Sequence, residues 1–281
     1  MPVYNTRPEH LRSAIDSILA QTFEDFEFLI LNDCSTDPQV EEVVKSYHDP
    51  RIVYVVNERN LGISCSRNRL LDMAQGEYLA VMDHDDISLP ERFEKQVAFL
   101  DEHPEVGVLN TQVRILGKNK ISNIAMDDIS IKKSLMMHCG DICHPSCMFR
   151  HSVLKEHGIR YEEMFSPSEN HAMFCRLIPY TKFATLSETL FLYRVWRGST
   201  SHRQAKQMEA ATQYVLSFAR RDNPDLWAMA QAHLIRKWRY RFCELVVLTK
   251  EQTWRETKWK LFGILPVWRV KETLPKFTMP S

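Results

Sequence analysis

The alternation of short apolar runs with helical patterns in the first part of the chain constrains its fold more than any other feature. Such an order is typical of parallel β-α-β units, in which a helix connects each strand to the next. The runs are apolar at successive positions, as in strands that helices cover on both faces. We therefore predict an α/β domain with a doubly wound sheet. The predicted strands are 26–31, 52–56 and 78–82, and the predicted helices are 9–21, 40–47 and 63–74.

The sequence pattern predicts that the main domain ends near Ser201 and that a separate extension follows. A length of 281 residues allows one large domain with an appendage. We predict a main domain over 1–201, made of halves 1–110 and 111–201, and a helical C-terminal extension over 202–281. Within the main domain, further elements are expected as helices at 90–103 and 169–178 and as strand-like runs at 106–115, 147–150 and 190–195.

Polar residues follow three of the predicted strands at the point where each strand ends. They form the segments Asn32–Asp37, Asn57–Gly62 and Asp83–Asp86. Ligands of doubly wound sheets bind at the carboxyl ends of the strands, so these segments are expected to share one rim.

The chain opens at Met1-Pro2-Val3-Tyr4-Asn5 without an apolar run to supply a strand before this loop. We therefore expect the natural start to lie upstream, which an intact-mass measurement would test.

Asp83-His84-Asp85-Asp86 places three carboxylates within four residues. Their mutual repulsion would raise their pKa values unless a cation lay among them. Hard oxygen ligands suit Mg²⁺ or Mn²⁺, and Mg²⁺ commonly completes its coordination sphere with substrate phosphate. The sequence therefore predicts a divalent cation with a nucleotide diphosphate. An acidic surface turn before a helix is the alternative interpretation.

Six short segments before Asp83 resemble, in order, the successive signatures of glycosyltransferase family 2, the inverting enzymes of the GT-A fold. These segments are Met1–Asn5, Ser17–Thr22, Asn32–Asp37, Asn60–Gly62, Ser66–Asn68 and Gly76–Tyr78. The resemblance extends over about residues 1–201. It implies a GT-A mixed sheet and the transfer of a sugar, with inversion, from a nucleotide-diphosphate donor, UDP- or dTDP-linked, to a glycan or lipid-linked acceptor. Surface polysaccharide, O-antigen or capsule synthesis is the implied setting.

The resemblance also implies roles for residues of the nucleotide-sugar site. By similarity, Pro2, Val3 and Tyr4 line the base and ribose pocket, Asp33 accepts a hydrogen bond from a pyrimidine ring, and Asn60 and Arg67 lie near the donor. Asp85 is the expected ligand of Mn²⁺ or Mg²⁺, and Asp83 the expected contact to ribose or to metal-bound water. His84 is expected to be a spacer in this motif, and Asp86 to support the two aspartates.

The base expected of an inverting enzyme is altered in this chain. The family's Glu-Asp pair matches Glu169 and Asn170, and an amide cannot accept the acceptor's proton. We predict Glu169 as the base, with His171 as an alternative; Glu169 could instead cap a helix. The resemblance places His144, Asn170 and Arg194 on the acceptor side.

Other interpretations concern the class of protein. The substitution at Asn170 leaves open a non-catalytic nucleotide-sugar-binding protein. A nucleotidyltransferase is disfavoured, because the chain has eight glycines and lacks a glycine- and lysine-rich phosphate loop. Cys139, Cys143, His144 and Cys147 could ligate zinc, but without paired C-x₂-C spacing.

Charge and composition bear on partners and localisation. The formal net charge is zero, so we expect no nucleic acid partner. Between Arg236 and Lys276, however, eleven basic residues accompany four acidic ones and four tryptophans. Basic, tryptophan-rich helices favour membrane interfaces, so we predict a cytoplasmic protein with peripheral contact to the cell membrane. Packing of this segment on the catalytic domain is the alternative.

Overall fold

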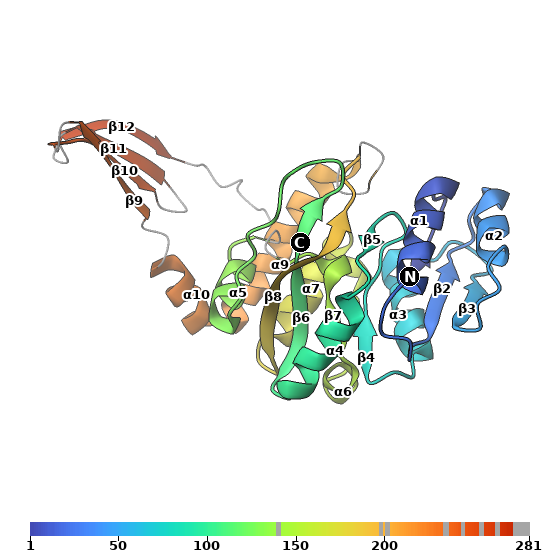
Figure 1. Ribbon diagram of the computed structural model, residues 1–281. Coiled ribbons are helices and arrows are strands. Elements are labelled where there is room, and N and C mark those ends of the chain that lie inside the picture. The colour runs from blue at the N-terminus through green and yellow to red at the C-terminus, as the bar shows by residue number, and fades with distance from the viewer. Residues whose placement is uncertain are drawn as a thin grey trace, which may run out of the picture. The chain divides into compact units, whose positions relative to one another are not determined.

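The computed structural model describes residues 1–138, 142–196, 199, 203–232, 236–242, 245–252, 256–261 and 265–271 (Figure 1). The chain separates into two compact units, Met1–Asp222 and Asn223–Ser281. The first unit contains two sheets and all of the predicted site residues. These compact units meet after Asp222, whereas the sequence predicts that the C-terminal extension starts after Ser201.

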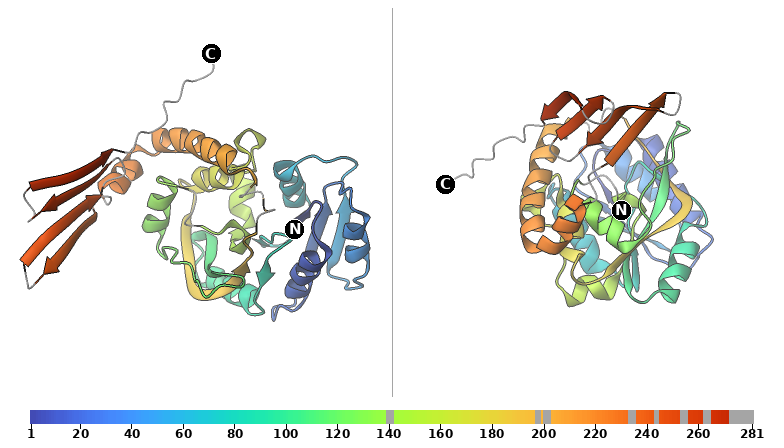
Figure 2. Two further views of the ribbon diagram at one scale, coloured as in Figure 1. Left: turned by 90° about the horizontal axis from the view of Figure 1, so that it is seen from above. Right: turned by 90° about the vertical axis from the view of Figure 1, so that its left-hand side faces the viewer.

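The first sheet is parallel and has the predicted β-α-β order. Its strands are β1 (Pro2–Val3), β2 (Phe28–Asn32) and β3 (Ile52–Val56), in the spatial order β1-β2-β3. The connecting helices are α1 (Pro8–Leu19), α2 (Pro38–Lys45) and α3 (Ile63–Met73). α1 and α2 pack together, whereas α3 packs on β1 and β2 (Figure 2). All three strands therefore point their carboxyl ends toward one rim, where the segments Asn32–Asp37 and Asn57–Gly62 begin, whereas Asp83–Asp86 follows a strand of the second sheet.

The second sheet is mixed, with the order β4-β7-β6-β8-β5. Its strands are β4 (Tyr78–Ala80), β5 (Ile87–Ser88), β6 (Val106–Ile115), β7 (Met148–Arg150) and β8 (Lys182–Tyr193). The longest pair, β6 and β8, is parallel. The accompanying helices are α4 (Arg92–Glu102), α5 (Asp128–Leu135), α6 (His151–Glu156), α7 (Glu169–Leu177) and α9 (Ala205–Asp222), with 3₁₀ turns at His144–Ser146 and Glu163–Phe165. The predicted α/β class is confirmed, although the strands form two sheets.

Gln21 fixes the end of α1 to the start of α4. Its side chain is buried, donates to the carbonyl of Leu89 over 2.9 Å and accepts a hydrogen bond from the backbone N–H of Phe93 over 3.0 Å. Phe93 lies in the first turn of α4, where backbone N–H groups lack partners within the helix. The glutamine therefore caps α4 from outside the helix.

The second unit corrects the prediction of a helical extension. It begins with α10 (Pro224–Ala232) and continues as an antiparallel sheet in the order β12-β11-β10-β9. These strands are β9 (Arg236–Phe242), β10 (Leu245–Gln252), β11 (Glu256–Leu261) and β12 (Leu265–Lys271). The helical prediction is thus wrong from Arg236 onward. Within β9, aromatic residues at 238, 240 and 242 alternate with arginines at 239 and 241, which is the period of a strand.

Among the residues that the structure describes, none belongs to a helix long and apolar enough to cross a membrane.

Candidate active site

Arg67 of α3 lies between two carboxylates from distant parts of the chain. Its Nη1 donates to Oε1 of Glu169 over 2.8 Å, and its Nη2 donates to Oδ1 of Asp83 over 3.2 Å. Glu169 begins α7, and Asp83 follows β4. The guanidinium also lies 5.4 Å from the ring centre of Tyr161. The side chain of Arg67 is buried, so this charge network is shielded from bulk solvent.

The pKa shifts in this network follow the ion pairs. Burial alone would raise the pKa of Asp83, but Arg67, together with His144 and His84, outweighs burial and lowers that pKa below the ordinary value. Burial opposes the charge of Arg67 as well, yet Asp83, Tyr161 and Glu169 together raise the pKa of the guanidinium. Asp83 is therefore an anion at neutral pH, as a contact to ribose or to a metal-bound water requires.

The acidic segment after β4 is fastened to the residues that follow β8. The backbone N–H of Arg194 donates to Oδ1 of Asp86 over 2.7 Å, and Nε of Arg194 donates to the carbonyl of Asp85 over 2.6 Å. Nε1 of Trp196 donates to Oδ2 of Asp85 over 2.9 Å. The predicted acceptor-side Arg194 thus contacts the predicted cation ligand directly. His84 points part of its ring inward, with a buried Nδ1 that has no partner among the described residues.

Asp86 gives a test of whether this segment fits a cation. Its side chain is 1% exposed, and Oδ2 has no hydrogen-bond partner among the described residues. Burial, and then repulsion from Asp83 and Asp85, raise the pKa of Asp86 well above its ordinary value. Three carboxylates therefore lie close enough to repel one another, and their oxygens are the ligands that Mg²⁺ and Mn²⁺ prefer. These oxygens suit such an ion, with Asp85 and Asp83 as the half-buried members, and a substrate diphosphate would complete the coordination, because no group of three metal-binding side chains converges among the described residues.

Asp33 is already engaged with the loop that precedes α3. Its Oδ1 accepts from Nδ2 of Asn57 over 2.6 Å and from the N–H of Leu61 over 2.9 Å, and its Oδ2 accepts from the N–H of Gly62 over 2.9 Å. Nδ2 of Asn60 donates to the main-chain carbonyl of Asp33 over 3.3 Å. A carboxylate offers about four acceptor positions, so three protein bonds leave about one for a ring imide. Asp33 is both a structural anchor and a possible base contact.

The remaining residues predicted for the nucleotide side lie in or directly after β1 and differ in their exposure to solvent. Val3 is 1% exposed and belongs to the hydrophobic core, whereas Tyr4 is 44% exposed beside the rim. Pro2 is buried and lines a cavity on the other side. Asn5, with a positive φ of 47°, accepts from the N–H of Thr36 over 2.9 Å. Of the three residues predicted for the base and ribose pocket, Tyr4 has the exposure to contact a ligand with its side chain.

Glu169 and its two neighbours have different surroundings. Glu169 is 4% exposed, and its Oε2 has no hydrogen-bond partner among the described residues. Oδ1 of Asn170 accepts from the N–H of His171 over 2.8 Å. The Nε2 of His171 lies 2.9 Å from the carbonyl of Leu135, and burial lowers the pKa of this histidine to about 4. His171 is therefore a packed, neutral residue, which disfavours it as the base.

His144 lies in the interior behind Arg67. It is 3% exposed, its Nε2 lies 2.8 Å from the hydroxyl of Tyr161, and burial lowers its pKa to about 3. Its ring contacts that of Phe174 edge to face, with centres 5.9 Å apart. A neutral histidine buried among aromatic rings positions Tyr161 beside Arg67. The contact of His144 with the acceptor remains a prediction.

The zinc hypothesis gains no support in the described part of the chain. No group of three or more His, Cys, Asp or Glu side chains is arranged there to hold a metal. Burial raises the pKa of both the Cys143 and Cys147 thiols, which disfavours the thiolate that zinc needs. Cys139 lies outside the described residues.

Three site residues were not predicted from the sequence: Asn57, Tyr161 and Trp196. Asn57 stands in a predicted polar segment, so position could have suggested it. Tyr161 follows no strand and gives no signal of its own. Trp196 comes directly after the predicted strand-like run 190–195, and its role depends on a contact with Asp85 that sequence spacing does not show.

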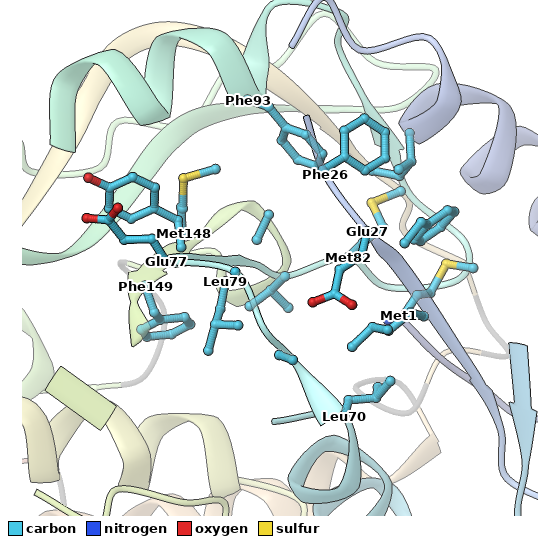
Figure 3. Close-up of a pocket in the computed structure, with 18 of the residues that line it drawn as sticks. Met1, Phe26, Glu27, Leu70, Glu77, Leu79, Met82, Phe93, Met148 and Phe149 are labelled. Carbon is cyan, nitrogen blue, oxygen red and sulfur yellow. Dashed lines mark hydrogen bonds between the residues drawn. The ribbon is translucent and has the colours of Figure 1, made fainter. Parts of the chain in front are cut away.

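A cavity of about 720 Å³ lies beside the rim within the first unit (Figure 3). Mainly apolar side chains line it, among them Leu70, Leu79, Met82 and Met148. Of the predicted site residues, Pro2 and Arg67 reach it. The cavity therefore borders β1 through Pro2. The charged groups that could perform chemistry lie outside it, apart from Arg67.

Comparison with known proteins now defines the class. Residues 1–158 match the model of the family described as Glycosyl transferase family 2. An uncharacterized glycosyltransferase of Methanocaldococcus jannaschii is 32% identical over 226 residues, which cover 77% of this chain and 76% of the relative. TuaG of Bacillus subtilis, whose name assigns it to teichuronic acid biosynthesis, is 37% identical over 103 residues, 36% of this chain and 40% of TuaG. The chain belongs to glycosyltransferase family 2.

A solved structure supports the same fold. S. aureus TarS in complex with UDP-GlcNAc superposes with a TM-score of 0.61 at 20% identity, over 83% of this chain and 79% of TarS. At this identity the likeness concerns the fold alone. The predicted GT-A architecture is thereby confirmed.

Proposed function

We propose that this protein is an inverting glycosyltransferase that moves a sugar from a UDP- or dTDP-linked donor to a glycan or lipid-linked acceptor in surface polysaccharide synthesis. The naming of TuaG for teichuronic acid biosynthesis supports the setting, and the UDP-GlcNAc of TarS supports a uridine donor. The remaining acceptor position of Asp33 suits the imide N–H of uracil or thymine. An acceptor of this kind brings the protein to a membrane surface, and the basic C-terminal segment is proposed to contact it.

One observation carries the proposal: Arg67 pairs with Glu169 and with Asp83 at the same time. The two carboxylates are 86 residues apart in the sequence and come from different elements. Inversion by a single displacement requires a base on one side of the reacting carbon and stabilisation of the leaving group on the other. A single buried guanidinium that holds a carboxylate at each end fixes their separation. It also orients them before a substrate binds.

A divalent cation, Mn²⁺ or Mg²⁺, would be held by Asp85, with Asp83 contacting ribose or a metal-bound water. When bound, it would supply positive charge to the departing diphosphate. The chain itself contributes the orientation of these groups. Arg194 holds the main chain of Asp85 and the carboxylate of Asp86. The guanidinium of Arg67 keeps Asp83 ionised.

Glu169 is proposed as the base. Arg67 occupies Oε1, which leaves Oε2 to accept the proton of an acceptor hydroxyl. Burial excludes water from this oxygen, so an arriving hydroxyl need not displace a hydration shell. Asn170, the neighbouring amide, can align the hydroxyl through a hydrogen bond but cannot take its proton.

The test compares two substitutions of nearly equal size. Glu169→Gln removes the proton acceptor, so transfer from a UDP-sugar should fall by about 10²- to 10⁴-fold, the range that general base catalysis contributes. Asn170→Asp adds a carboxylate where the family has one, and activity should be retained or rise. Glu188→Gln changes an exposed glutamate and serves as the matched control. Full activity of Glu169→Gln would overturn the assignment of the base.

A second function, nucleotide-sugar binding without transfer, is favoured by the substitution at Asn170 and by the hold of Arg67 on Glu169. It predicts that UDP raises the thermal stability of the wild type, as a ligand of the native state does. It also predicts that neither donor hydrolysis nor transfer occurs. Appearance of transfer only in Asn170→Asp would establish this second function.

A further inference from the structure

Asp85 is held from two directions by the residues that follow β8. Nε1 of Trp196 donates to the carboxylate Oδ2 over 2.9 Å, and Nε of Arg194 donates to the main-chain carbonyl over 2.6 Å. One bond restrains the side chain and the other restrains the backbone. The carboxylate therefore has one preferred orientation, although the residue is only half-buried.

Trp196 is itself fixed by the start of α1. The guanidinium of Arg7 lies 4.9 Å from the centre of the indole ring, as in a cation–π contact. The ring of His10 meets the indole nearly edge to face, with centres 5.7 Å apart and planes at 76°. Since Arg7 and His10 come from the segment after β1, Trp196 connects the nucleotide-side loop to the acidic segment.

The chemistry of the indole decides what this connection can do. An indole N–H only donates hydrogen bonds, so Trp196 cannot itself be a metal ligand. It engages Oδ2 of Asp85 and leaves Oδ1, which has no hydrogen bond among the described residues. Groups that orient a metal ligand in this way typically change metal affinity by about 10- to 100-fold.

We infer that Trp196 is a positioning residue for the cation: its N–H fixes the Asp85 carboxylate so that Oδ1 is the oxygen offered to the metal. This inference rests on the proposed function, because it assumes a divalent cation at Asp85. It assigns a role to a tryptophan that neither touches the reacting atoms nor lies on the acidic segment. The fixed orientation reduces the rotational freedom that Asp85 loses when the ion binds.

The experiment measures Mn²⁺ binding to the full chain by electron paramagnetic resonance in the presence of UDP. Trp196→Phe keeps an aromatic ring against Arg7 and His10 but lacks the N–H donor. Its dissociation constant for Mn²⁺ should rise by about 10- to 100-fold. Trp227→Phe makes the same change on α10, and its affinity should equal that of the wild type. Asp85→Asn should abolish binding.

The outcomes separate this inference from the proposed function. If the wild type binds Mn²⁺, Asp85→Asn does not, and Trp196→Phe binds as tightly as the wild type, the positioning role is wrong while the cation site stands. If the wild type binds no Mn²⁺, the positioning role of Trp196 and the cation site at Asp85 are both wrong. A lower Tm of Trp196→Phe with unchanged affinity would indicate packing alone. If the Phe variant does not fold, Trp196→Leu, which also lacks a donor, replaces it.

Discussion

Asp33 shows how one residue can hold a site together before it binds anything. Asp33→Asn places an amide where the carboxylate accepts three hydrogen bonds, and an amide nitrogen cannot accept from the N–H of Leu61 or Gly62. Leaving a buried donor without a partner costs about 1–3 kcal/mol, and these donors are only partly buried, so the free energy of unfolding should fall by about 1 kcal/mol in urea titrations. UDP affinity should fall with it.

Asp37→Asn is the matched control for this change. Asp37 caps α2 by accepting from the N–H of Gln39, and asparagine caps helices about as well as aspartate does. Its stability should equal that of the wild type. Equal stability of Asp33→Asn and Asp37→Asn would show that the Asp33 contacts do not hold the loop.

His171 makes stability depend on pH. Burial lowers its pKa in the folded protein to about 4, against an ordinary value of 6.5. Between these values the unfolded chain binds more protons than the folded one, so acid destabilises the fold. The contribution is complete above the unfolded pKa and is lost as the pH falls toward the folded pKa. Each unit of difference corresponds to about 1.4 kcal/mol.

His171→Gln tests this assignment, because the glutamine amide can donate to the carbonyl of Leu135 but does not titrate. Unfolding free energies at about pH 7.5 and about pH 5 should differ less for the variant than for the wild type, since one buried histidine no longer contributes. His144 also stays neutral in the fold, so some dependence should remain. An identical pH dependence in both proteins would contradict the role of His171.

Individual residues were predictable where their position in the fold carried the information. Asp33 follows β2, and Asp83 and Asp85 follow β4, as the sequence order predicted, but β4 belongs to the mixed sheet, so a single rim shared by all three remains a prediction. The partners of these residues were not predictable. The pairing of Arg67 with Glu169 spans 102 residues and joins α3 to the first residue of α7. Long-range contacts of this kind have no local pattern.

Among the elements, those with strong periodicity were predicted closely. α7 was expected at 169–178 and occupies Glu169–Leu177, because its apolar residues recur at helical spacing. β8 was expected at 190–195 but extends over Lys182–Tyr193; the part before Leu190 was missed because it includes exposed polar residues such as Glu188. The tail from Arg236 was misread because basic and aromatic residues suit both a cationic helix and an alternating strand. The alternation of aromatic residues and arginines in β9 has the period of a strand.

The junction of α1 and α4 gives a prediction at the scale of elements. Gln21→Ala removes the acceptor of the Phe93 N–H and the donor to the Leu89 carbonyl, both in a buried setting. Each buried group left without a partner costs about 1–3 kcal/mol, so α4 should lose its anchor and the urea midpoint should fall. Gln39→Ala changes an exposed glutamine of α2 and should shift the midpoint little. A similar midpoint for both variants would refute the capping role.

At the scale of the whole molecule, the division after Asp222 assigns the predicted site residues and the basic segment to different units. All predicted site residues lie in Met1–Asp222, which has its own hydrophobic core. A chain ending at Asp222 should therefore fold and bind UDP with the affinity of the full chain, as thermal shift measurements would record. Loss of the folded state in this shorter chain would show that the second unit is part of the fold.

The same pair of proteins tests the role of the second unit at membranes. The strands β9 to β12 are rich in lysine, arginine and tryptophan, and basic residues near an anionic surface contribute about 1 kcal/mol each. The full chain should therefore sediment with vesicles that contain phosphatidylserine, and release should follow as salt screens the attraction. The chain ending at Asp222 should stay in the supernatant. Because UDP binding is expected in both proteins, a full chain that binds UDP but ignores the vesicles would reject membrane contact while leaving the transferase intact.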